Sequence, residues 1–216
     1  TNFKAYLIQC ITNLHVGSGD ANYGIIDKMV QRDSVTNYPT IHASSLKGAL
    51  REHFEKKWDK GSDKVNSVFG KETGENDSGT HVFLNADLVA IPIRCTQKQF
   101  VMSFDKKLSD FINTKSSNIV GNEIFSLSVD ENNDKLFGAQ GNDFYAEDYS
   151  LSGSAYQTPF CFEQTLIKNQ FATFKTDHFE NLVKNLPVIA RNKVGENKNL
   201  WYEEIVPHQS IFLTFI

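Results

Sequence analysis

The chain has 216 residues, a formal net charge of −4 and a hydrophobic fraction of 40%. This length suits one large domain with a real core, and the negative charge argues against a protein that binds polyanions indiscriminately. No apolar run is long enough to cross a membrane. The three cysteines are widely spaced and lack a C-x-x-C pair, which argues against a disulfide framework or zinc site and favours a reducing cytoplasm.

The first predicted element is a strand over Lys4–Thr12, which leads into a loop with two glycines. In this loop, His15-Val-Gly17-Ser18-Gly19, the alternate glycines let successive N–H groups face one concavity and bind a phosphate. The loop lacks the third glycine of a dinucleotide fingerprint and the Gly-Lys-Ser/Thr of a P-loop. His15 is either a hydrogen-bonded structural histidine or an acid–base group, and the loop alone leaves both readings open.

Asp27 is a single carboxylate within the apolar run Ile25–Val30. A carboxylate in such a run costs free energy unless it is paired, solvated in a cleft or bound to a metal. Its pairing partner would be the adjacent Lys28 or the nearby Arg32. The residues alone favour neither the ion pair nor a functional role.

Apolar residues at every fourth position predict a helix over Ser45–Lys60: Leu46, Leu50, Phe54 and Trp58. Ser44 or Ser45 is a suitable N-cap, and Lys47 and Arg51 follow in the first two turns. Exposed N–H groups, hydroxyls and cations at a helix start form an anion site. An ordinary capped helix with a solvated basic edge fits the same residues.

The rest of the chain has weaker local patterns. We expect a flexible loop or hairpin at Gly61–Thr80, a strand at His81–Arg94 and a weak helix at Lys98–Asn113. A polar insertion around Ser116–Gly153 follows, then a strand at Tyr156–Leu166, a short helix near Phe179–Asn185 and a strand at Ile211–Ile216. Together they predict one α+β domain over residues 1–216 with a ferredoxin-like core. Because an apolar strand is a poor end for a soluble protein, we expect the natural chain to continue beyond Ile216.

Charge is unevenly distributed along the chain. Lys and Arg outnumber the acids between residues 28 and 60, whereas Lys135 is the single Lys or Arg between residues 120 and 150, a strongly acidic stretch. A basic patch on one face can hold a phosphate backbone although the whole protein is acidic. The distribution therefore predicts a defined groove for a nucleic acid.

The ordered motifs resemble those of the RAMP superfamily of CRISPR proteins, and more narrowly the repeating backbone subunit of the type III-B (Cmr) effector complex. The resemblance rests on these segments, in order: LH-x-G-x-G, G-I-I-D, Q-R-D, Y-P-x-I, S-S-L-K-G-A-L-R-E, V-F-G, F-L-N-A-D, A-I-P-I-R, L-P-V-I-A-R-N and L-W-Y-E-E. They span nearly the whole chain, while residues from about Thr96 to Phe171 contribute little. The glycine-rich segment that RAMP proteins usually carry near the C-terminus is missing before Ile216.

The resemblance implies an RRM-like fold with loop or hairpin insertions, and a cytoplasmic subunit that binds guide RNA (crRNA), polymerises with copies of itself in a helical filament and joins other Cmr subunits. It also implies metal-dependent cleavage of complementary target RNA at regular intervals, with a hairpin "thumb" that displaces bases. The thumb is expected in Gly61–Thr80 or Ser116–Gly153. The expected guide-phosphate contacts are Gly17, Ser18, Gly19, Ser44, Ser45, Lys47, Arg51 and, more weakly, Arg32.

Asp27 matches the cleavage position of the family, where it would hold Mg²⁺ or Mn²⁺ together with RNA phosphate oxygens or orient the attacking 2′-hydroxyl. His15 would act as acid or base, and Glu203 and Glu204 are further catalytic candidates unless they form a solvated acidic pair. Three alternatives remain: a RAMP scaffold that binds RNA without cutting it, a metal-independent guide-processing endoribonuclease, and an interaction scaffold without RNA contact.

Overall fold

The computed structural model describes residues 2–19, 25–71, 78–157, 159–160, 171–193 and 199–216. Its elements, in chain order, are β1 (Ala5–Gln9), β2 (Thr40–Ile41), α1 (Ala43–Trp58), α2 (Asp63–Phe69), β3 (Ala86–Ile93), β4 (Val101–Asp105), α3 (Lys106–Val120), β5 (Lys135–Phe137), β6 (Phe144–Ala146), β7 (Tyr149–Ser154), β8 (Phe171–Phe174), α4 (Thr176–Lys184), β9 (Val188–Lys193), β10 (Asn199–Glu204) and β11 (Ile211–Phe215). This mixture of strands and few helices confirms the predicted α+β class.

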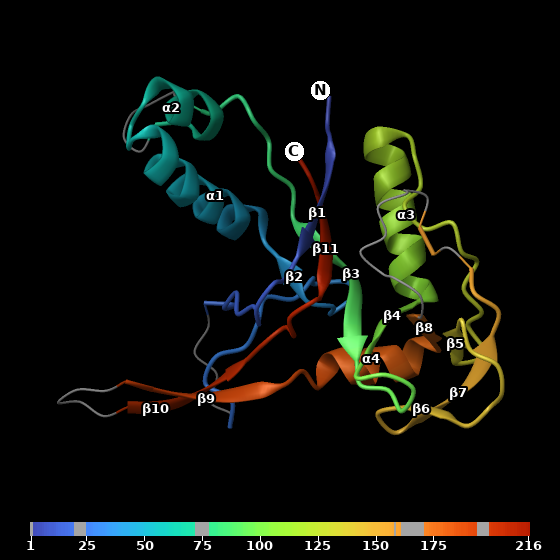
Figure 1. Ribbon diagram of the computed structural model, residues 1–216. Coiled ribbons are helices and arrows are strands. Elements are labelled where there is room, and N and C mark those ends of the chain that lie inside the picture. The colour runs from blue at the N-terminus through green and yellow to red at the C-terminus, as the bar shows by residue number, and fades with distance from the viewer. Residues whose placement is uncertain (1, 20–24, 72–77, 158, 161–170, 194–198) are drawn as a thin grey trace.

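A nine-stranded sheet organises the described residues, with the order β1-β11-β3-β4-β8-β5-β7-β6 and β2 attached to β3 (Figure 1). The first and last strands pair antiparallel, with Ala5 opposite Phe215. β11 therefore lies between β1 and β3, and all five of its residues are buried. β9 and β10 form a separate antiparallel hairpin that extends away from the sheet (Figure 1).

The core lies where β4 and β8 pair in parallel beneath α3 and α4. Every residue of β4 and β8 is buried, as expected for strands covered on both faces. The ring of Phe171 stacks on Phe104, with centroids 5.6 Å apart, and on Phe137, with centroids 4.5 Å apart. Burial of each such side chain stabilises the fold by roughly 1.5–3 kcal/mol, so the scattered phenylalanines of the sequence are largely core residues.

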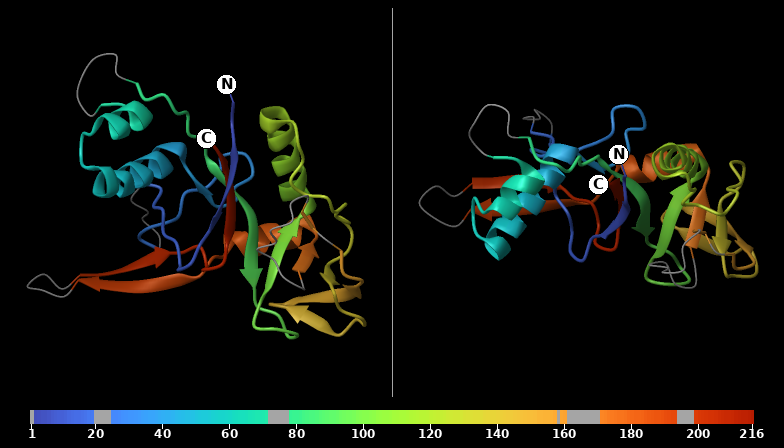
Figure 2. Two further views of the ribbon diagram at one scale, coloured as in Figure 1. Left: turned by 45° about the horizontal axis from the view of Figure 1, so that its top comes forward. Right: turned by 90° about the horizontal axis from the view of Figure 1, so that it is seen from above.

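Helices α1 and α2 stand away from the sheet and pack on each other (Figures 1 and 2). Their contact is aromatic, because Phe54 stacks on Trp58 at 4.4 Å and faces Phe69 of α2 at 6.1 Å. Helix α1 begins at Ala43 and ends at Trp58, so the predicted start and end are each two residues late. Part of the predicted loop 61–80 is the helix α2, which Ser62 caps through the N–H of Val65.

The prediction of a weak helix over 98–113 is wrong in its first half, which forms β4. Asp105 ends this strand and caps α3 by accepting a hydrogen bond from the N–H of Leu108 at 2.9 Å. The segment 116–153, predicted to be an insertion, supplies the end of α3 and the strands β5, β6 and β7, which continue the main sheet. Its polar composition reflects turns between short strands that join the sheet.

The last third of the chain matches the predictions unevenly. The short helix expected near 179–185 is α4, and the expected final strand is β11. The strand β8 and the hairpin β9–β10 were not predicted. The strand expected at Tyr156–Leu166 falls largely outside the described residues.

Candidate functional site

A segment over residues 25–32 brings the separate sequence motifs together. On one side, Ser18 N donates to the Met29 carbonyl at 3.0 Å, and Gln31 N donates to the Val16 carbonyl at 2.8 Å. On the other side, the segment runs parallel to β10, and Lys28 lies opposite Glu203. The glycine loop, Asp27 and the acidic end of β10 are therefore neighbours in space.

Asp27 is exposed and held by the main chain of β10. Its Oδ2 accepts a hydrogen bond from the N–H of Tyr202 at 2.7 Å, while its own N–H donates to the Tyr202 carbonyl at 3.1 Å. Among the described residues, no cation pairs with Asp27: Lys28 reaches Glu203, and Arg32 reaches Glu204. The carboxylate is thus fixed in direction and still open to solvent. Pairing with Lys28 or Arg32, the structural alternative, does not account for it.

His15 lies against Glu204, the last residue of the same strand. Its Nδ1 is 2.7 Å from the main-chain carbonyl of Glu204. Because a carbonyl can only accept, Nδ1 carries the proton, and in the neutral ring Nε2 is left as a proton acceptor. A Cβ added at Gly17 would lie 3.2 Å from this Nε2, so the glycine leaves room beside the acceptor nitrogen.

Glu204 is buried, and both of its carboxylate oxygens are occupied. Oε2 accepts from Val30 N at 3.0 Å, and Oε1 accepts from Nη2 of Arg32 at 2.5 Å. Arg32 also donates to the carbonyls of Asn37 and Val183. Both Glu204 oxygens are therefore engaged within the protein, which disfavours the expected catalytic role of Glu204. The Arg32 guanidinium, a weaker expected RNA contact, is bonded to Glu204 and to two main-chain carbonyls.

Glu203 points to the opposite face of β10. It accepts hydrogen bonds from the Trp201 indole at 2.6 Å and from Nε of Arg191 at 3.2 Å, and Lys28 Nζ lies 3.5 Å away. The Trp201 hydrogen bond, with Arg191 and the nearby cations, lowers the pKa of the Glu203 carboxyl against the opposing effect of burial. Glu203 is therefore ionised at neutral pH and does not fit the role of a proton donor.

Gln31, which was not among the predicted site residues, connects the start of α1 to the glycine loop. The Gln31 amide nitrogen donates to the Gly17 carbonyl at 3.1 Å and to Ser45 Oγ at 2.9 Å, and its oxygen accepts from His42 N at 2.8 Å. Asn85 caps the next N–H, that of Ala43, at 2.8 Å. His42 is the N-cap residue but makes no side-chain cap bond, so the predicted serine cap is wrong.

The predicted RNA contacts of α1 fall into two groups, one at the start of the helix and one further along it. Ser44 is exposed in the first turn, and the Lys47 ammonium lies 6.0 Å from the Phe83 ring centroid. Arg51 points toward α2, where it pairs with Glu55 at 2.8 Å and donates to the Gly70 carbonyl at 3.0 Å. Ser44, Ser45 and Lys47 therefore share the glycine-loop end of α1, whereas Arg51 joins the two helices.

The donor set around Asp27 does not form a metal site by itself. In the part of the chain that the structure describes, no group of three or more His, Cys, Asp or Glu side chains could hold a metal ion. Asp27 offers one carboxylate, which fits a hard cation only if other oxygen ligands come from a bound molecule.

The sequence pattern of the RAMP superfamily matches residues 7–215. The chain belongs to the RAMP superfamily. It is 25% identical to the CMR subunit Cmr4 of the CRISPR system of Saccharolobus solfataricus, covering 99% of this chain and 83% of that protein. It is also 25% identical to the Cmr endoribonuclease Cmr4 of Pyrococcus furiosus, covering 99% of this chain and 81% of that one.

Solved structures of the Cmr-beta complex and of Cmr4 contain chains with the same fold. The type III-B Cmr-beta complex bound to cognate target RNA contains a chain with a TM-score of 0.78 and 23% identity, which covers 100% of this chain and 83% of that chain. The apo state of Cmr-beta gives a TM-score of 0.78 at 25% identity, covering 99% and 83%. Oligomeric Cmr4 from Pyrococcus furiosus gives 0.69 at 18% identity, covering 100% and 81%.

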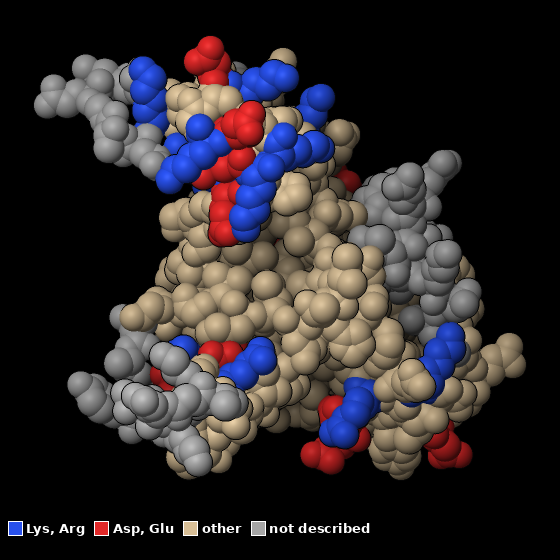
Figure 3. All heavy atoms as spheres, turned by 60° about the vertical axis from the view of Figure 1, so that its left-hand side comes forward, with Lys and Arg blue, Asp and Glu red and all other residues tan. Residues whose placement is uncertain are grey.

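The hairpin β9–β10 is the most extended feature of this RAMP protein. Figure 3 shows charged side chains gathered over α1 and α2 and a second charged group beside the hairpin, with a largely uncharged, hollowed surface between them. Lys28 lies over the Trp201 ring at 4.9 Å, whereas Leu200 and Tyr202 are exposed.

None of the helices that the structure describes is long and apolar enough to cross a membrane.

Proposed function

We propose that this chain is the repeating backbone subunit of a CRISPR ribonucleoprotein, which binds a guide RNA and cuts a complementary target RNA. The observation that carries the proposal is the exposed Asp27 carboxylate, fixed by the Tyr202 N–H beside the glycine loop. Two relatives named Cmr4, one of them called an endoribonuclease, match almost the whole chain. The Cmr-beta complex with target RNA and the oligomeric Cmr4 support RNA and other copies of this chain as partners.

In this proposal the chemistry is an attack by the RNA on itself. The target 2′-hydroxyl gives its proton to Nε2 of His15, and the 2′-oxygen forms a bond to the adjacent phosphorus. The bond from phosphorus to the 5′-oxygen then breaks, and that oxygen takes a proton from solvent. The products are a 2′,3′-cyclic phosphate and a 5′-hydroxyl end, and Asp27 orients the reacting ribose.

RNA is held in this proposal by groups that carry no sequence preference. Main-chain N–H groups of the Gly17–Gly19 loop, Ser44, Ser45 and Lys47 contact guide phosphates, which leaves specificity to base pairing. We assign the thumb to the hairpin β9–β10, because it extends from the body next to Asp27 and exposes Leu200 and Tyr202. The sequence instead suggested Gly61–Thr80 or Ser116–Gly153. The described part of the first includes α2, and the second supplies the end of α3 and strands of the main sheet.

We further propose that cleavage needs a divalent cation, Mg²⁺ or Mn²⁺, with Asp27 as the protein ligand and RNA phosphate oxygens as the others. Such a cation would stabilise the negative charge that develops on the phosphate. Chelation with EDTA should then stop cleavage by the assembled complex, re-addition of Mg²⁺ should restore it, and retention of guide RNA should not change.

The deciding experiment uses the complex purified with its native partners and a labelled complementary RNA. The proposal predicts metal-dependent cuts at regular spacing in the target and no cutting of repeat RNA by the lone subunit. Binding of the target without cleavage would favour the non-catalytic scaffold. Cutting of repeat RNA by the lone subunit in EDTA would favour a guide-processing nuclease.

A further inference from the structure

Two buried polar side chains anchor the segment 27–32 from opposite directions. Glu204 is 1% exposed and Gln31 is 7% exposed. Burial of a charge or an amide is costly unless its hydrogen bonds are made in full. Both residues make such bonds, and in each case the partners belong to the elements that carry the candidate site.

Glu204 controls the part of the segment that carries Asp27. Its carboxylate holds Val30 N and Arg32, and its N–H donates to the Lys28 carbonyl at 2.9 Å. The main chain on both sides of Lys28 is therefore fixed to β10. The Asp27 carboxylate accepts a hydrogen bond from the Tyr202 N–H. Its position therefore depends on how the segment 27–32 is aligned with β10.

The same residue also orients His15. The Glu204 carbonyl accepts from His15 Nδ1 at 2.7 Å, which keeps the proton on Nδ1 and leaves Nε2 as the acceptor. An outer hydrogen bond of this kind fixes both the tautomer and the ring orientation of a histidine. This contact comes from the main chain, so the Glu204 side chain acts on His15 through its bonds to Val30 N and Arg32, which hold the end of β10 in place.

Gln31 controls the phosphate-binding side. It links the Gly17 carbonyl to Ser45 Oγ and accepts from His42 N. One amide therefore sets the distance between the glycine loop and the first turn of α1. Both elements would have to contact the same stretch of guide RNA.

We propose that Glu204 and Gln31 are positioning residues with separate tasks: Glu204 holds Asp27 and His15 in the arrangement for cleavage, and Gln31 holds the glycine loop against α1 for RNA binding. This proposal rests on the proposed function and refines it. Neither side chain is assigned a direct contact with the reacting atoms, since all of their polar atoms are engaged within the protein.

The first test is Glu204→Gln in the assembled complex. The glutamine oxygen can accept from Val30 or from Arg32 but not from both, because its amide nitrogen only donates. We expect the single-turnover cleavage rate at saturating target to fall about 10–100-fold, the range typical for loss of an outer-layer hydrogen bond at an active site. Guide retention should stay within about twofold.

The matched control is Asp87→Asn. Asp87 is also a buried carboxylate with a cationic partner, but it lies in β3 and pairs with Lys115 of α3 rather than with β10 or the segment 27–32. Suppose that Asp87→Asn loses about as much stability as Glu204→Gln but keeps the wild-type cleavage rate. The slower cleavage by Glu204→Gln then comes from lost positioning and not from lost stability. An equal fall in cleavage rate for both variants would overturn the proposal for Glu204.

A second readout does not depend on cleavage. In the full chain, ¹⁵N NMR should show the neutral His15 ring with its proton on Nδ1. Glu204→Gln keeps the main-chain carbonyl that accepts from Nδ1, so it acts on His15 only through the lost side-chain bonds to Val30 N and Arg32. If those bonds hold the end of β10 in place, the variant should weaken the Nδ1 bond and shift the ring toward a mixture of tautomers. A His15→Gln variant assigns the signal. An unchanged tautomer together with an unchanged cleavage rate would refute the assignment of Glu204.

If Glu204→Gln does not fold, Glu204→Asp serves in its place. Aspartate keeps the charge that pairs with Arg32, but its shorter side chain does not reach Val30 N. It should fold and should lower the cleavage rate less than glutamine would in a folded protein. A wild-type rate in folded Glu204→Asp would also overturn the proposal.

Gln31→Leu tests the other task. We expect the dissociation constant for guide RNA to rise at least tenfold while the His15 tautomer stays as in the wild type. The control is Gln9→Leu, which removes a side-chain bond to Gln209 at 2.7 Å outside the site and should leave guide affinity unchanged. Equal affinities for Gln31→Leu and wild type would refute the role of Gln31.

The outcomes also separate this inference from the proposed function. If Asp27→Ala keeps full target cleavage, the function is wrong whatever Glu204 does. If Asp27→Ala abolishes cleavage but Glu204→Gln changes neither rate nor tautomer, the function stands and the positioning role falls.

Discussion

At the residue scale, two adjacent acids on β10 have opposite environments. Successive strand residues face opposite sides, so Glu203 meets Trp201, Arg191 and Lys28, whereas Glu204 turns into the protein toward Arg32. The two acids therefore do not form a solvated pair, and both are buried. The strand period of the L-W-Y-E-E segment was the signal that could have separated them.

The low pKa of Glu203 gives a direct prediction. Trp201→Phe removes the indole N–H that is the largest cause of the lowering, so the pKa of Glu203 should rise toward the ordinary value of about 4.3. Because a depressed pKa stabilises the fold at pH above the ordinary value, this variant should also lose less stability on acidification than wild type does. ¹³C NMR titration of the Glu203 carboxyl checks the shift, and an unchanged midpoint would contradict it.

Other residues of the site were predictable to different degrees. Asp27 and His15 could be singled out because an isolated carboxylate and a histidine beside a glycine loop are chemically conspicuous. Gln31 could not, because glutamine is common on surfaces and its importance comes from three partners that the fold brings to it. Local sequence carries no information about such contacts.

At the element scale, the start and the middle of α1 have different tasks. Lys47 belongs to the turn next to the glycine loop, while Arg51 joins α1 to Glu55 and to the Gly70 carbonyl at the end of α2. The sequence predicted both residues as phosphate contacts in the first two turns, but the packing of α2 engages Arg51 within the protein. That packing is aromatic and was not visible in a segment that reads as a loop.

Single substitutions should separate these two cations. Lys47→Ala should weaken guide RNA retention and lower its salt dependence by about one phosphate contact, with little change in stability. Arg51→Ala should instead lower the free energy of unfolding by about 1–2 kcal/mol, from the lost ion pair and hydrogen bond, with guide affinity nearly unchanged. Salt-dependent binding curves and urea unfolding measure the two effects; the reverse pattern would contradict the assignment.

Strand β4 shows where the pattern of apolar residues misleads. Residues 98–113 contain the end of a turn, a buried strand and the first half of α3, so a single period does not fit them. Asp105 marks the change, because it ends the strand and caps the helix. A short, fully buried strand next to a cap is not distinguishable from a helix by periodicity alone.

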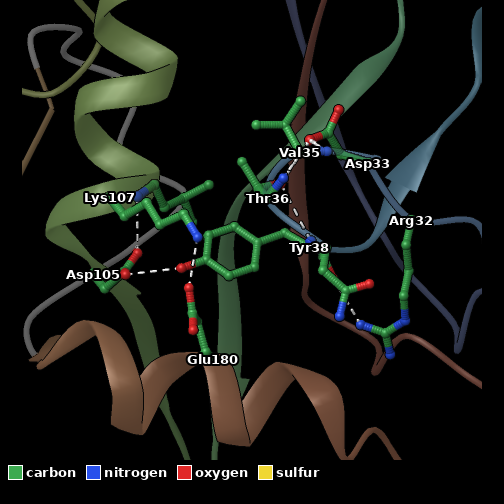
Figure 4. A network of polar contacts seen from close by, with 10 residues as sticks. Arg32, Asp33, Val35, Thr36, Tyr38, Asp105, Lys107 and Glu180 are labelled. Carbon is green, nitrogen blue, oxygen red and sulfur yellow. Dashed lines mark hydrogen bonds and ion pairs between the residues drawn. The ribbon is translucent and has the colours of Figure 1, made fainter.

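At the scale of the whole molecule, a polar network joins the segment 32–38 to α3 and α4 (Figure 4). Tyr38 donates to Asp105 at 2.8 Å, and Lys107 pairs with Glu180 of α4 at 2.6 Å. The site-bearing segment is therefore anchored to the core at its far end. The sequence predicted the α+β class from element types, but these long-range contacts and the sheet order follow only from the fold.

Burial of Asp105 predicts the pH dependence of stability. Desolvation by burial raises the pKa of this carboxyl above its ordinary range, and the hydrogen bonds of Leu108 and Tyr38 offset only part of that effect. The folded protein then binds this proton more tightly than the unfolded chain does. The contribution of Asp105 to stability is therefore greatest below about pH 4 and falls as pH rises toward the raised pKa.

Asp105→Asn should remove this fall, because the amide carries no charge and can still accept from Leu108 N while it donates to the Tyr38 oxygen. Urea unfolding from about pH 4 to 7 should show a flatter stability profile for the variant than for wild type. Asp87, whose pKa burial also raises, remains in both proteins as an internal reference. Identical slopes would contradict the assignment.

The most direct test of the central claim is the single-turnover cleavage rate of a complementary RNA by the assembled complex that carries Asp27→Asn. Asparagine keeps an oxygen that can accept from the Tyr202 N–H, so the loop should keep its position while the charge is lost. We predict a fall of at least about 100-fold in the cleavage rate, with guide and target binding within about twofold of wild type. A wild-type cleavage rate in this variant would contradict the proposal that Asp27 carries the reaction.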